Sequence, residues 1–344
     1  MTYFTRDATL TVFVEVARDQ GLDPFRLAAA AGLSPAHLTD PDLHVPAETF
    51  SALLELAAER GGIEDFGLKV AERWNLATLG VVGQVVREQP SARKALEALV
   101  HYIWVQNEAL SMALEDAGGL VVVRLGSLAG GHRRGRQTTE FLLSGLVRVL
   151  RSFMGVDWSP QETHLGHAPP ASLVLHRRAL GRGLVFDSGF EGLVCDAADL
   201  ERALPRTDPG MARRLEAYVE DLAARQGRRL ADEVRDLVVA RLPGGDCTVA
   251  RLAVQLHIDR RTVCRRLAAE GTSFTQILDQ ARRTLAAAHL ERSGRRLDLV
   301  AEQLGFSSLS AFSRWHRLTF SETASARRAR TWPTRPHLQN GTPG

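Results

Sequence analysis

Two groups of side chains in the last third of this 344-residue chain have the types and spacing that recognition of nucleic acid requires. In the first group Arg261 and Arg265 stand four residues apart, so both point the same way from a helix. Arginine has two uses at DNA, a bidentate contact to guanine or a contact to a phosphate. The sequence leaves open which arginine makes which contact. The candidate DNA-contacting residues are Arg260, Arg261, Cys264, Arg265, Leu309, Ser310, Ser313, Arg314 and Arg317.

Each group falls on the second helix of a short unit that occurs twice. The first unit is a helix at 248–256, a turn at 257–259 and a helix at 260–267. The second is a helix at 297–304, a turn at 305–307 and a helix at 308–317. This is the pattern of a helix-turn-helix motif, whose second helix lies in the DNA major groove. We expect the apolar positions to be buried: Val249, Leu252, Ala253, Leu256, Val263, Leu267, Leu297, Val300, Ala301, Leu304, Phe306 and Phe312.

A long helix, predicted over 274–293, joins the two units. Its apolar residues recur at steps of three and four and so form one face. A helix of that length spans roughly 30 Å at about 1.5 Å per residue, close to the ~34 Å between successive major grooves. This spacing fits two helix-turn-helix units that contact one face of a duplex. The alternative interpretation of the arginine-rich helix is an ordinary basic surface helix. The face consists of Phe274, Ile277, Leu278, Ala281, Leu285 and Ala288.

The distribution of charge favours a polyanionic partner at the C-terminal end. Residues 228–330 contain 19 arginines and 11 acidic residues, a net charge of +8 inside a chain whose net charge is +3. The tail adds Arg335, so residues 1–227 carry a net charge of −6. No apolar run is long enough for a transmembrane helix, and the N-terminus lacks a signal-peptide pattern. Three widely spaced cysteines fit a reducing cytoplasm.

The N-terminal half alternates between helical and strand patterns. Helices are expected within 8–104, and a β-hairpin follows at 109–125 with its turn at 115–119. A helix at 137–153 comes next, then short strands. The basic loop 130–136 either holds an anion at that helix start or is a solvated connection. The fold class is thus an α+β N-terminal domain with mixed helices and short strands, and an all-α C-terminal domain. The predicted strands are 162–165, 173–175, 184–186 and 192–195.

The chain is predicted to divide into four parts. Residues 1–205 form a sensing or dimerisation domain and 206–228 a linker helix, which begins at Asp208-Pro-Gly210. Residues 229–330 form the DNA-binding domain. The tail 331–344, rich in proline and polar residues, is expected to be disordered.

Catalytic and metal-binding patterns find little support. His164 and His167 have the spacing of a metal pair, but no third ligand is near them in sequence. Neither a nucleophile elbow nor a phosphate-binding loop occurs. Cys195 and Cys247 lack a neighbouring cysteine or histidine. We expect no enzyme activity, no cofactor and no metal.

The C-terminal region resembles the DNA-binding domain of AraC/XylS-type bacterial transcriptional regulators. The segments that carry the resemblance over 229–330 are Leu304-Gly-Phe306, 310–314, 261–267 and 270–274. It implies base contacts by Arg261, Cys264 and Arg265, and by Leu309, Ser310, Ser313 and Arg314 in the second unit.

Three positions depart from the family pattern. Cys264 replaces a frequent Gln, His316 replaces a core Phe, and Ser321-Glu-Thr-Ala324 lacks the usual Gly and Pro. From the last departure we expect the final helix to fray or run on. The first unit should therefore supply most of the DNA affinity, and the second should add discrimination.

The N-terminal half is similar to the effector or dimerisation domain of the ornithine-regulator branch of that family. The supporting segments are 32–35, 53–60, 66–68, 156–158 and 204–208. The resemblance implies a cytoplasmic transcription regulator that binds promoter or operator DNA, forms a homodimer, responds to a small-molecule effector and, if an activator, contacts RNA polymerase. Two alternatives remain: a constitutive DNA-binding regulator whose N-terminal half only dimerises, and an enzyme with an appended DNA-binding domain.

Overall fold

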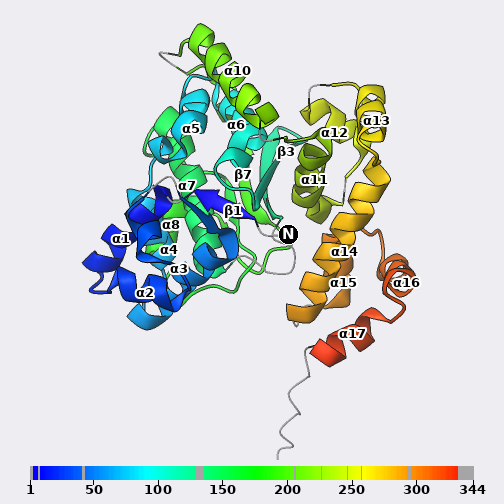
Figure 1. The fold of residues 1–344 in the computed structure, drawn as a ribbon, viewed down its shortest axis with the longest axis horizontal. Coiled ribbons are helices and arrows are strands. Elements are labelled where there is room, and N and C mark those ends of the chain that lie inside the picture. Colours follow the sequence, from blue (N-terminus) through cyan, green and yellow to red (C-terminus); the bar gives the residue numbers. More distant parts are fainter. Residues whose placement is uncertain are drawn as a thin grey trace, which may run out of the picture.

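The chain folds into an N-terminal body and a smaller, all-helical C-terminal body that lie side by side (Figure 1). The computed structural model describes residues 3–6, 8–40, 43–128, 135–204, 207–225, 227–245, 247–256, 258–292 and 296–331. Among these residues, no helix is long and apolar enough to cross a membrane.

Helices dominate the first hundred residues, as the sequence predicts. Ser91 caps α6 by accepting a hydrogen bond from the Lys94 amide, and Gly62 ends α3 in the left-handed conformation with φ 62°. A two-stranded antiparallel sheet of β1 (Phe4–Arg6) and β2 (His44–Pro46) was not expected from the sequence. The helices are α1 (Ala8–Asp19), α2 (Pro24–Ala30), η1 (Pro35–Leu38), α3 (Ala47–Gly61), α4 (Phe66–Arg73), η2 (Leu76–Leu79), α5 (Gly80–Arg87), α6 (Ala92–Tyr102) and η3 (Ile103–Val105).

A five-stranded sheet in the order β3-β4-β7-β5-β6 forms the other half of the N-terminal body. The predicted hairpin is present: β3 (Leu110–Ala117) pairs antiparallel with β4 (Leu120–Ser127) across Gly118 and Gly119, both at positive φ. β7 (Glu191–Asp196) pairs antiparallel with β4 and with β5 (Glu162–His164), while β6 (Leu184–Val185) runs parallel to β5. Helix α7 (Arg136–Met154) packs against α3, α4 and the sheet.

One predicted strand is wrong. Of residues 173–175, Leu173 precedes α8 and the other two begin it; in α8 (Val174–Leu180) the buried His176, Ala179 and Leu180 recur with helical spacing. The short apolar run Leu173-Val-Leu175 is too short to distinguish a strand from a helix. The basic loop predicted over 130–136 lies outside the described residues except for Gly135 and Arg136.

The link to the C-terminal body runs through α9 (Ala197–Leu200) and α10 (Pro209–Arg225). Asp208 caps α10 by accepting hydrogen bonds from the amides of Gly210 and Met211. These bonds, the Met211 amide first, lower the pKa of the Asp208 carboxyl. The helix packs on α5, so it belongs to the N-terminal body.

The C-terminal body consists of helices, as predicted. They are α11 (Leu230–Arg241), η4 (Leu242–Gly244), α12 (Val249–Gln255), α13 (Arg260–Ala269), α14 (Phe274–Arg292), α15 (Leu297–Gln303), α16 (Leu309–Phe320) and α17 (Ala324–Thr331). Two separate apolar clusters stabilise it, one under α11–α14 around Leu252 and Leu267, and one under α14–α17 around Leu304 and Phe312. Each helix-turn-helix unit therefore has its own core, and α14 contributes to both.

Candidate functional site

The first helix-turn-helix unit is held by caps at the start of each helix. Thr248 accepts a hydrogen bond from the Arg251 amide at the start of α12, and Asp259 accepts one of 2.9 Å from the Thr262 amide at the start of α13. The hydrogen bonds from Thr262 lower the pKa of the Asp259 carboxyl. Val263 and Leu267 are fully buried, so the opposite face of α13 is turned outward.

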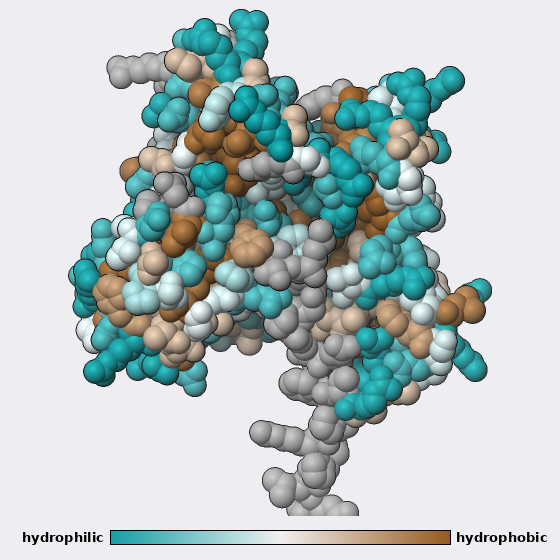
Figure 2. Space-filling view, viewed as in Figure 1, coloured by the Kyte–Doolittle hydropathy of each residue, from teal (hydrophilic) through white to brown (hydrophobic). Residues whose placement is uncertain are grey.

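That outward face carries all four residues predicted in the first unit. Arg260, Arg261, Cys264 and Arg265 are exposed, and so is Arg266, to which the sequence reasoning gave no role. None of these arginines forms an ion pair with a carboxylate in the described part of the chain. Figure 1 shows α13 at the upper right, on the side away from the N-terminal body, and Figure 2 shows hydrophilic side chains over α12 and α13. The face is therefore cationic and accessible.

The second unit presents its predicted residues in the same way. Ser308 caps α16, where Phe312 and His316 are fully buried. Arg314 and Arg317 have no carboxylate partner among the described residues. Leu318, at 80% exposure, is an apolar side chain on this helix that the sequence reasoning missed. The exposed residues of the predicted set are Leu309, Ser310, Ser313, Arg314 and Arg317.

Helix α14 fixes the position of the second unit through polar contacts. The Trp315 indole of α16 donates a 2.9 Å hydrogen bond to Asp279 of α14. Arg282 of α14 donates to the carbonyl oxygens of Leu304 and Gly305 at the turn, at 3.0 Å each, and its guanidinium lies 4.4 Å from the Phe306 ring centroid. These contacts orient α16 relative to the helix that connects it to α13.

The expectation that the final helix frays or runs on is wrong. Helix α16 ends at Phe320 because Ser321 adopts the left-handed conformation, with φ 58°, and α17 begins at Ala324. A non-glycine residue in this conformation is strained, and the structure tolerates it. His316 fills the position of a core phenylalanine by donating a hydrogen bond of 3.0 Å to the Glu322 carbonyl and by packing with its ring centroid 4.7 Å from that of Phe320.

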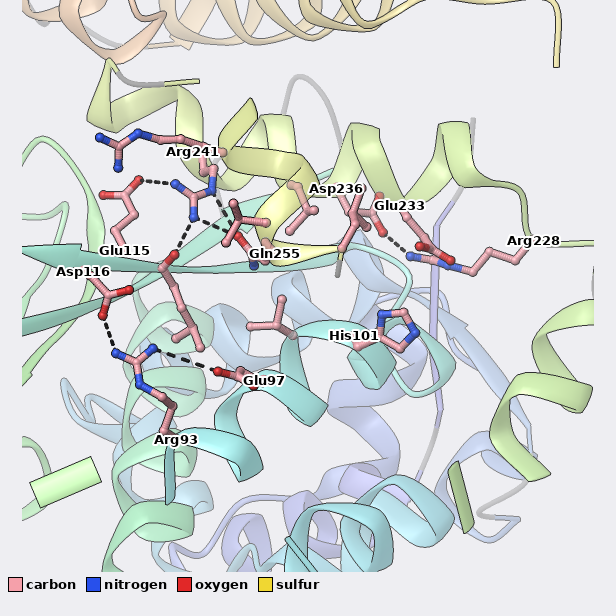
Figure 3. Close-up of a pocket in the computed structure, with 16 residues that line it drawn as sticks. Arg93, Glu97, His101, Glu115, Asp116, Arg228, Glu233, Asp236, Arg241 and Gln255 are labelled. Atoms are coloured by element: carbon pink, nitrogen blue, oxygen red, sulfur yellow. Dashed lines mark hydrogen bonds and ion pairs between the residues drawn. The ribbon is translucent and has the colours of Figure 1, made fainter. Parts of the chain in front are cut away.

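The DNA-binding body is docked on the N-terminal sheet through α11, which contacts β3 and β4. Arg241, 5% exposed, donates hydrogen bonds to the Leu114 carbonyl of β3 and to Gln255 of α12, and lies 3.5 Å from Glu115 (Figure 3). A Cβ atom on Gly126 of β4 would lie 2.9 Å from the Ala240 Cα, so only glycine permits this approach. Arg241 thus joins the edge strand β3 to α12 of the first helix-turn-helix unit.

Three further contacts reach from the N-terminal body to the C-terminal body. Gln303 of α15 donates a 3.0 Å hydrogen bond to the Gly189 carbonyl. Tyr3 packs against the core of the first unit, where burial raises the pKa of its hydroxyl while Arg235 of α11 opposes that shift. The guanidinium of Arg228 lies 4.2 Å from the Trp104 ring and pairs with Asp236. Both helix-turn-helix units are therefore held by the N-terminal body.

A polar cavity of about 310 Å³ opens between the two bodies (Figure 3). Its lining includes Arg93, Glu97 and Asp116 from the N-terminal side and Arg228 and Asp236 from the C-terminal side. These charges pair mainly with one another, Arg93 with Asp116 and Arg228 with Asp236. Burial raises the pKa of Asp236 to about 6, although Arg228 opposes the shift.

Two further cavities, more apolar than the first, lie inside the N-terminal body, between α3, α7 and the hairpin. One measures about 90 Å³ and the other about 250 Å³. They share lining residues, among them Phe50, Leu110 and Leu142. Concave apolar spaces with a few polar groups are the usual form of a small-molecule site.

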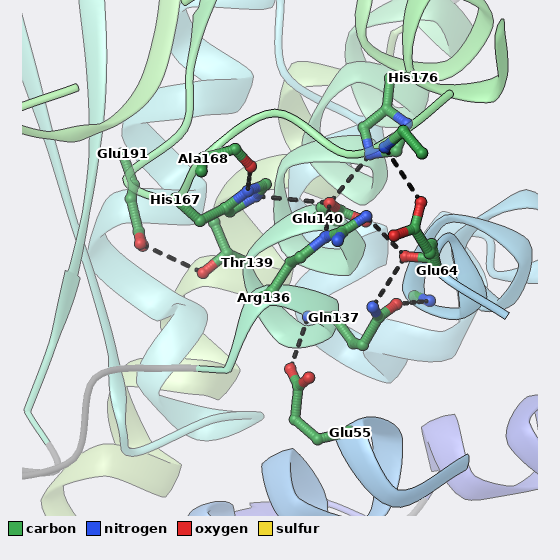
Figure 4. A network of polar contacts seen from close by, with 12 residues as sticks. Glu55, Glu64, Arg136, Gln137, Thr139, Glu140, His167, Ala168, His176 and Glu191 are labelled. Carbon is green, nitrogen blue, oxygen red and sulfur yellow. Dashed lines mark hydrogen bonds and ion pairs between the residues drawn. The ribbon is translucent and has the colours of Figure 1, made fainter. Parts of the chain in front are cut away.

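A buried polar network surrounds Glu140 of α7 (Figure 4). Its fully buried carboxylate lies 2.8 Å from Arg136, 2.9 Å from His176 and 3.4 Å from His167. Burial lowers the pKa of His167, against the opposing effects of its bond to the Ala168 carbonyl and of Glu140. His164, the other member of the predicted pair, bonds Ser188 and Glu162 instead. Among the described residues no group of three or more His, Cys, Asp or Glu could hold a metal ion.

Two cysteines considered for catalysis lie apart. Cys195 is fully buried in β7, and burial raises the pKa of its thiol to about 12, so it remains protonated at neutral pH. Cys247 is partly buried, precedes α12 and packs against the core of the first unit. Both positions fit packing roles.

Two outward-facing helix-turn-helix units on one domain, beside an α+β domain with internal cavities, define a DNA-binding regulator of the one-component class. Residues 21–204 match the family model of the arabinose-binding domain of AraC transcription regulators, and residues 252–330 match a helix-turn-helix domain. The chain belongs to the AraC family of transcription regulators, and it contains both the ligand-domain type and the DNA-binding type of that family.

The chain is similar to named transcription regulators over nearly their whole length. The HTH-type transcriptional regulator VirS of Mycobacterium tuberculosis is 28% identical over 94% of this chain and 96% of its own. The ornithine utilization regulator of Pseudomonas aeruginosa is 25% identical over 88% of this chain and 90% of its own. The crystal structure of the transcriptional regulator CdpR from Pseudomonas aeruginosa covers 89% of this chain and 96% of its own, with 19% identity and a TM-score of 0.43.

Proposed function

We propose that α13 and α16 enter two successive major grooves on one face of a promoter or operator, and that a small molecule bound in the N-terminal domain controls this binding. The observation that supports the DNA contacts is the set of exposed arginines without carboxylate partners among the described residues. Cations held on a helix that is itself fixed by a buried face are the groups that contact phosphates and guanine edges. They are Arg260, Arg261, Arg265, Arg314 and Arg317.

The remaining predicted positions have complementary roles in this proposal. Ser310 and Ser313 donate or accept hydrogen bonds at base edges or phosphates, and Leu309 and Cys264 make apolar contacts such as that with a thymine methyl group. Helix α14 has 19 residues and so spans about 28 Å at ~1.5 Å per residue. This length supports a spacing of about one helical turn of DNA between the two contacts.

Control by an effector would act through the contacts between the bodies. Arg241 ties the sheet to α12, and Gln303 ties α15 to the loop before β7. A ligand that shifts the hairpin relative to that loop changes the orientation of one unit relative to the other. Both units reach their grooves at once only in a suitable relative orientation. A small shift of one unit therefore changes the affinity for DNA.

The chain would act in the cytoplasm as a homodimer, without catalysis, and would contact RNA polymerase if it activates transcription. Its matched relatives are regulators and not enzymes, which supports the non-catalytic assignment. The alternative is a constitutive regulator whose N-terminal body only dimerises.

Selection of bound fragments from random duplex DNA by the full chain tests the proposal. We expect a site with two conserved segments whose centres are about 10–11 base pairs apart. Affinity should fall steeply with salt, because several phosphates are neutralised. A site with one short segment would contradict the two-groove arrangement. An unchanged DNA affinity in the presence of every ligand that binds the N-terminal body would favour the constitutive alternative.

A further inference from the structure

The two cavities inside the N-terminal body adjoin one another and share part of their walls. The inner cavity, about 90 Å³, and the outer one, about 250 Å³, share six lining residues. The outer cavity opens along α3, and the inner one extends between α7 and the hairpin toward Trp74. The shared residues are Thr5, Phe50, Asn107, Leu110, Thr138 and Leu142.

Aromatic side chains form one wall of the inner cavity. Phe50 and Phe141 meet edge to face with ring centroids 6.0 Å apart, and Trp74 meets Phe141 in the same way at 6.4 Å. Aliphatic residues, including Leu99 and Val149, form much of the rest. This wall suits the apolar body of a ligand, because water gains little hydrogen bonding there.

A single cation, Arg6, lines the inner cavity. Its position is fixed by the backbone: β1 pairs with β2, and the Arg6 amide donates a 3.0 Å hydrogen bond to the Gln106 carbonyl. The Nε atom of Arg6 is buried and has no hydrogen-bond partner in the part of the chain that the structure describes. No carboxylate of the described residues forms an ion pair with this guanidinium. A partly desolvated cation without a partner is costly, and an anion bound beside it removes that cost.

We propose that these adjoining cavities bind a small organic monocarboxylate, whose carboxylate pairs with Arg6 and whose aliphatic or aromatic body packs against Phe50, Trp74 and Phe141. The inference rests on the proposed control by an effector and names the chemical class of that effector. Guanidinium and carboxylate form two parallel hydrogen bonds, which fixes the direction in which the acid enters.

The outer cavity restricts the class further. Glu48 and Glu55 line it, and Glu55 accepts a 2.7 Å hydrogen bond from the Gln137 amide. Burial raises the pKa of the Glu55 carboxyl, which the bond from Gln137 opposes. A second negative charge on the ligand, as in a phosphate monoester or a dicarboxylate, would face these acids. An organic cation would face Arg6. A monoanion with one charged end is the class that meets neither repulsion.

Binding of matched probes to the full chain tests the proposal. The probes are octanoate and benzoate, with octanamide and benzamide as neutral counterparts of equal shape and octyl phosphate as the dianion. Isothermal titration calorimetry gives each Kd, and a raised unfolding midpoint provides a second reading. We expect the acids to bind at least tenfold more tightly than their amides and than octyl phosphate.

Two variants locate the site. Arg6→Gln removes the cation and should weaken binding of the acids by about 10- to 100-fold, the value of a charged hydrogen bond, while leaving the amides unchanged. Gly145→Leu places a side chain in the inner cavity, where a Cβ would have only the Trp74 ring at 3.6 Å, and should abolish binding of both acids. Arg18→Gln, at an exposed arginine of α1, is the matched control and should bind as the parent does.

Equal binding of acids and amides, or acid binding that survives Arg6→Gln, would overturn the proposal, as would the absence of binding by either acid. Measuring the affinity for the selected DNA sites distinguishes failure of this proposal from failure of the proposed function. If neither acid binds and another compound class still changes the affinity for DNA, control by an effector stands and the monocarboxylate assignment is wrong.

Discussion

Arg241 at the end of α11 and Glu115 on β3 approach to 3.5 Å across the boundary between the two bodies, with side chains that are 6% and 14% exposed. Glu115 also pairs with Arg124 of β4 at 2.8 Å, so the three charges link the hairpin to the DNA-binding body. Partial burial makes this link sensitive to loss of one partner, because the remaining group is left desolvated.

Replacing Arg241 with Gln should loosen the docking of the two bodies. We expect a loss of about 2–4 kcal/mol in the free energy of unfolding, since the hydrogen bonds to Leu114 and Gln255 also disappear. Urea unfolding measures the loss, and faster proteolysis in the segment between α10 and α11 reports the loosening. Arg225→Gln, at an exposed pair with Asp221, should change stability by less than about 0.5 kcal/mol. Equal effects of the two variants would show that Arg241 does not hold the bodies together.

The arginines of α13 should contribute more DNA affinity than those of α16. We expect Arg261→Ala and Arg265→Ala each to cost about 1–3 kcal/mol on the selected site, because α13 carries the denser set of arginines without a carboxylate partner in the described part of the chain. Fluorescence anisotropy at several salt concentrations separates a base contact, lost mainly on the specific site, from a phosphate contact, lost on all DNA with a shallower salt slope. Arg18→Ala is the control. If Arg314→Ala abolishes binding while both α13 variants retain it, the ranking of the two units is reversed.

His316 should make the stability of the C-terminal body depend on pH. Burial lowers its pKa below the ordinary 6.5, which its bond to the Glu322 carbonyl opposes, and Arg327 lowers it further. The unfolded chain therefore binds this proton at a higher pH than the folded chain does. Stability should decrease as the pH falls below about 6.5, until the folded pKa is passed.

A His316→Phe variant, measured by urea unfolding at about pH 7.5 and about pH 5.5, should lose less stability on acidification than the parent. His44→Gln, at an exposed histidine, provides the comparison. An identical pH dependence in the parent and in His316→Phe would assign the effect to other groups, for example His167 beside Glu140.

Ser321→Gly should stabilise the second unit by about 1 kcal/mol, because glycine adopts the left-handed conformation at 321 without the steric cost of a side chain. The thermal midpoint is the measurement. Ala217→Gly, at an exposed position inside α10, should instead cost about 0.5–1 kcal/mol. A loss of stability in Ser321→Gly would mean that the serine side chain has a role beyond ending α16.

The local pattern of the sequence predicted most of the DNA-binding half. Apolar residues at helical spacing, capping residues such as Asp259 and Ser308, and arginines on the opposite face predicted both helix-turn-helix units and the helix between them, because these signals act within one or two turns of chain. The hairpin and α7 followed from period and turn chemistry in the same way. Two features depended on longer-range packing: the left-handed Ser321 that ends α16, and α8, whose few apolar residues fit a strand or a helix.

Only the tertiary structure decided which distant groups meet. Arg6 and Trp74 line one cavity, Arg241 reaches Leu114, and His167 and His176 converge on Glu140, although the residues of each pair are 27 to 127 positions apart in the sequence. No periodicity encodes such contacts, because they arise from the packing of whole elements and not from the preferences of neighbouring residues. The sequence by itself therefore determined that this chain has two DNA-reading units, whereas the fold decided where a ligand fits and how the two bodies are joined.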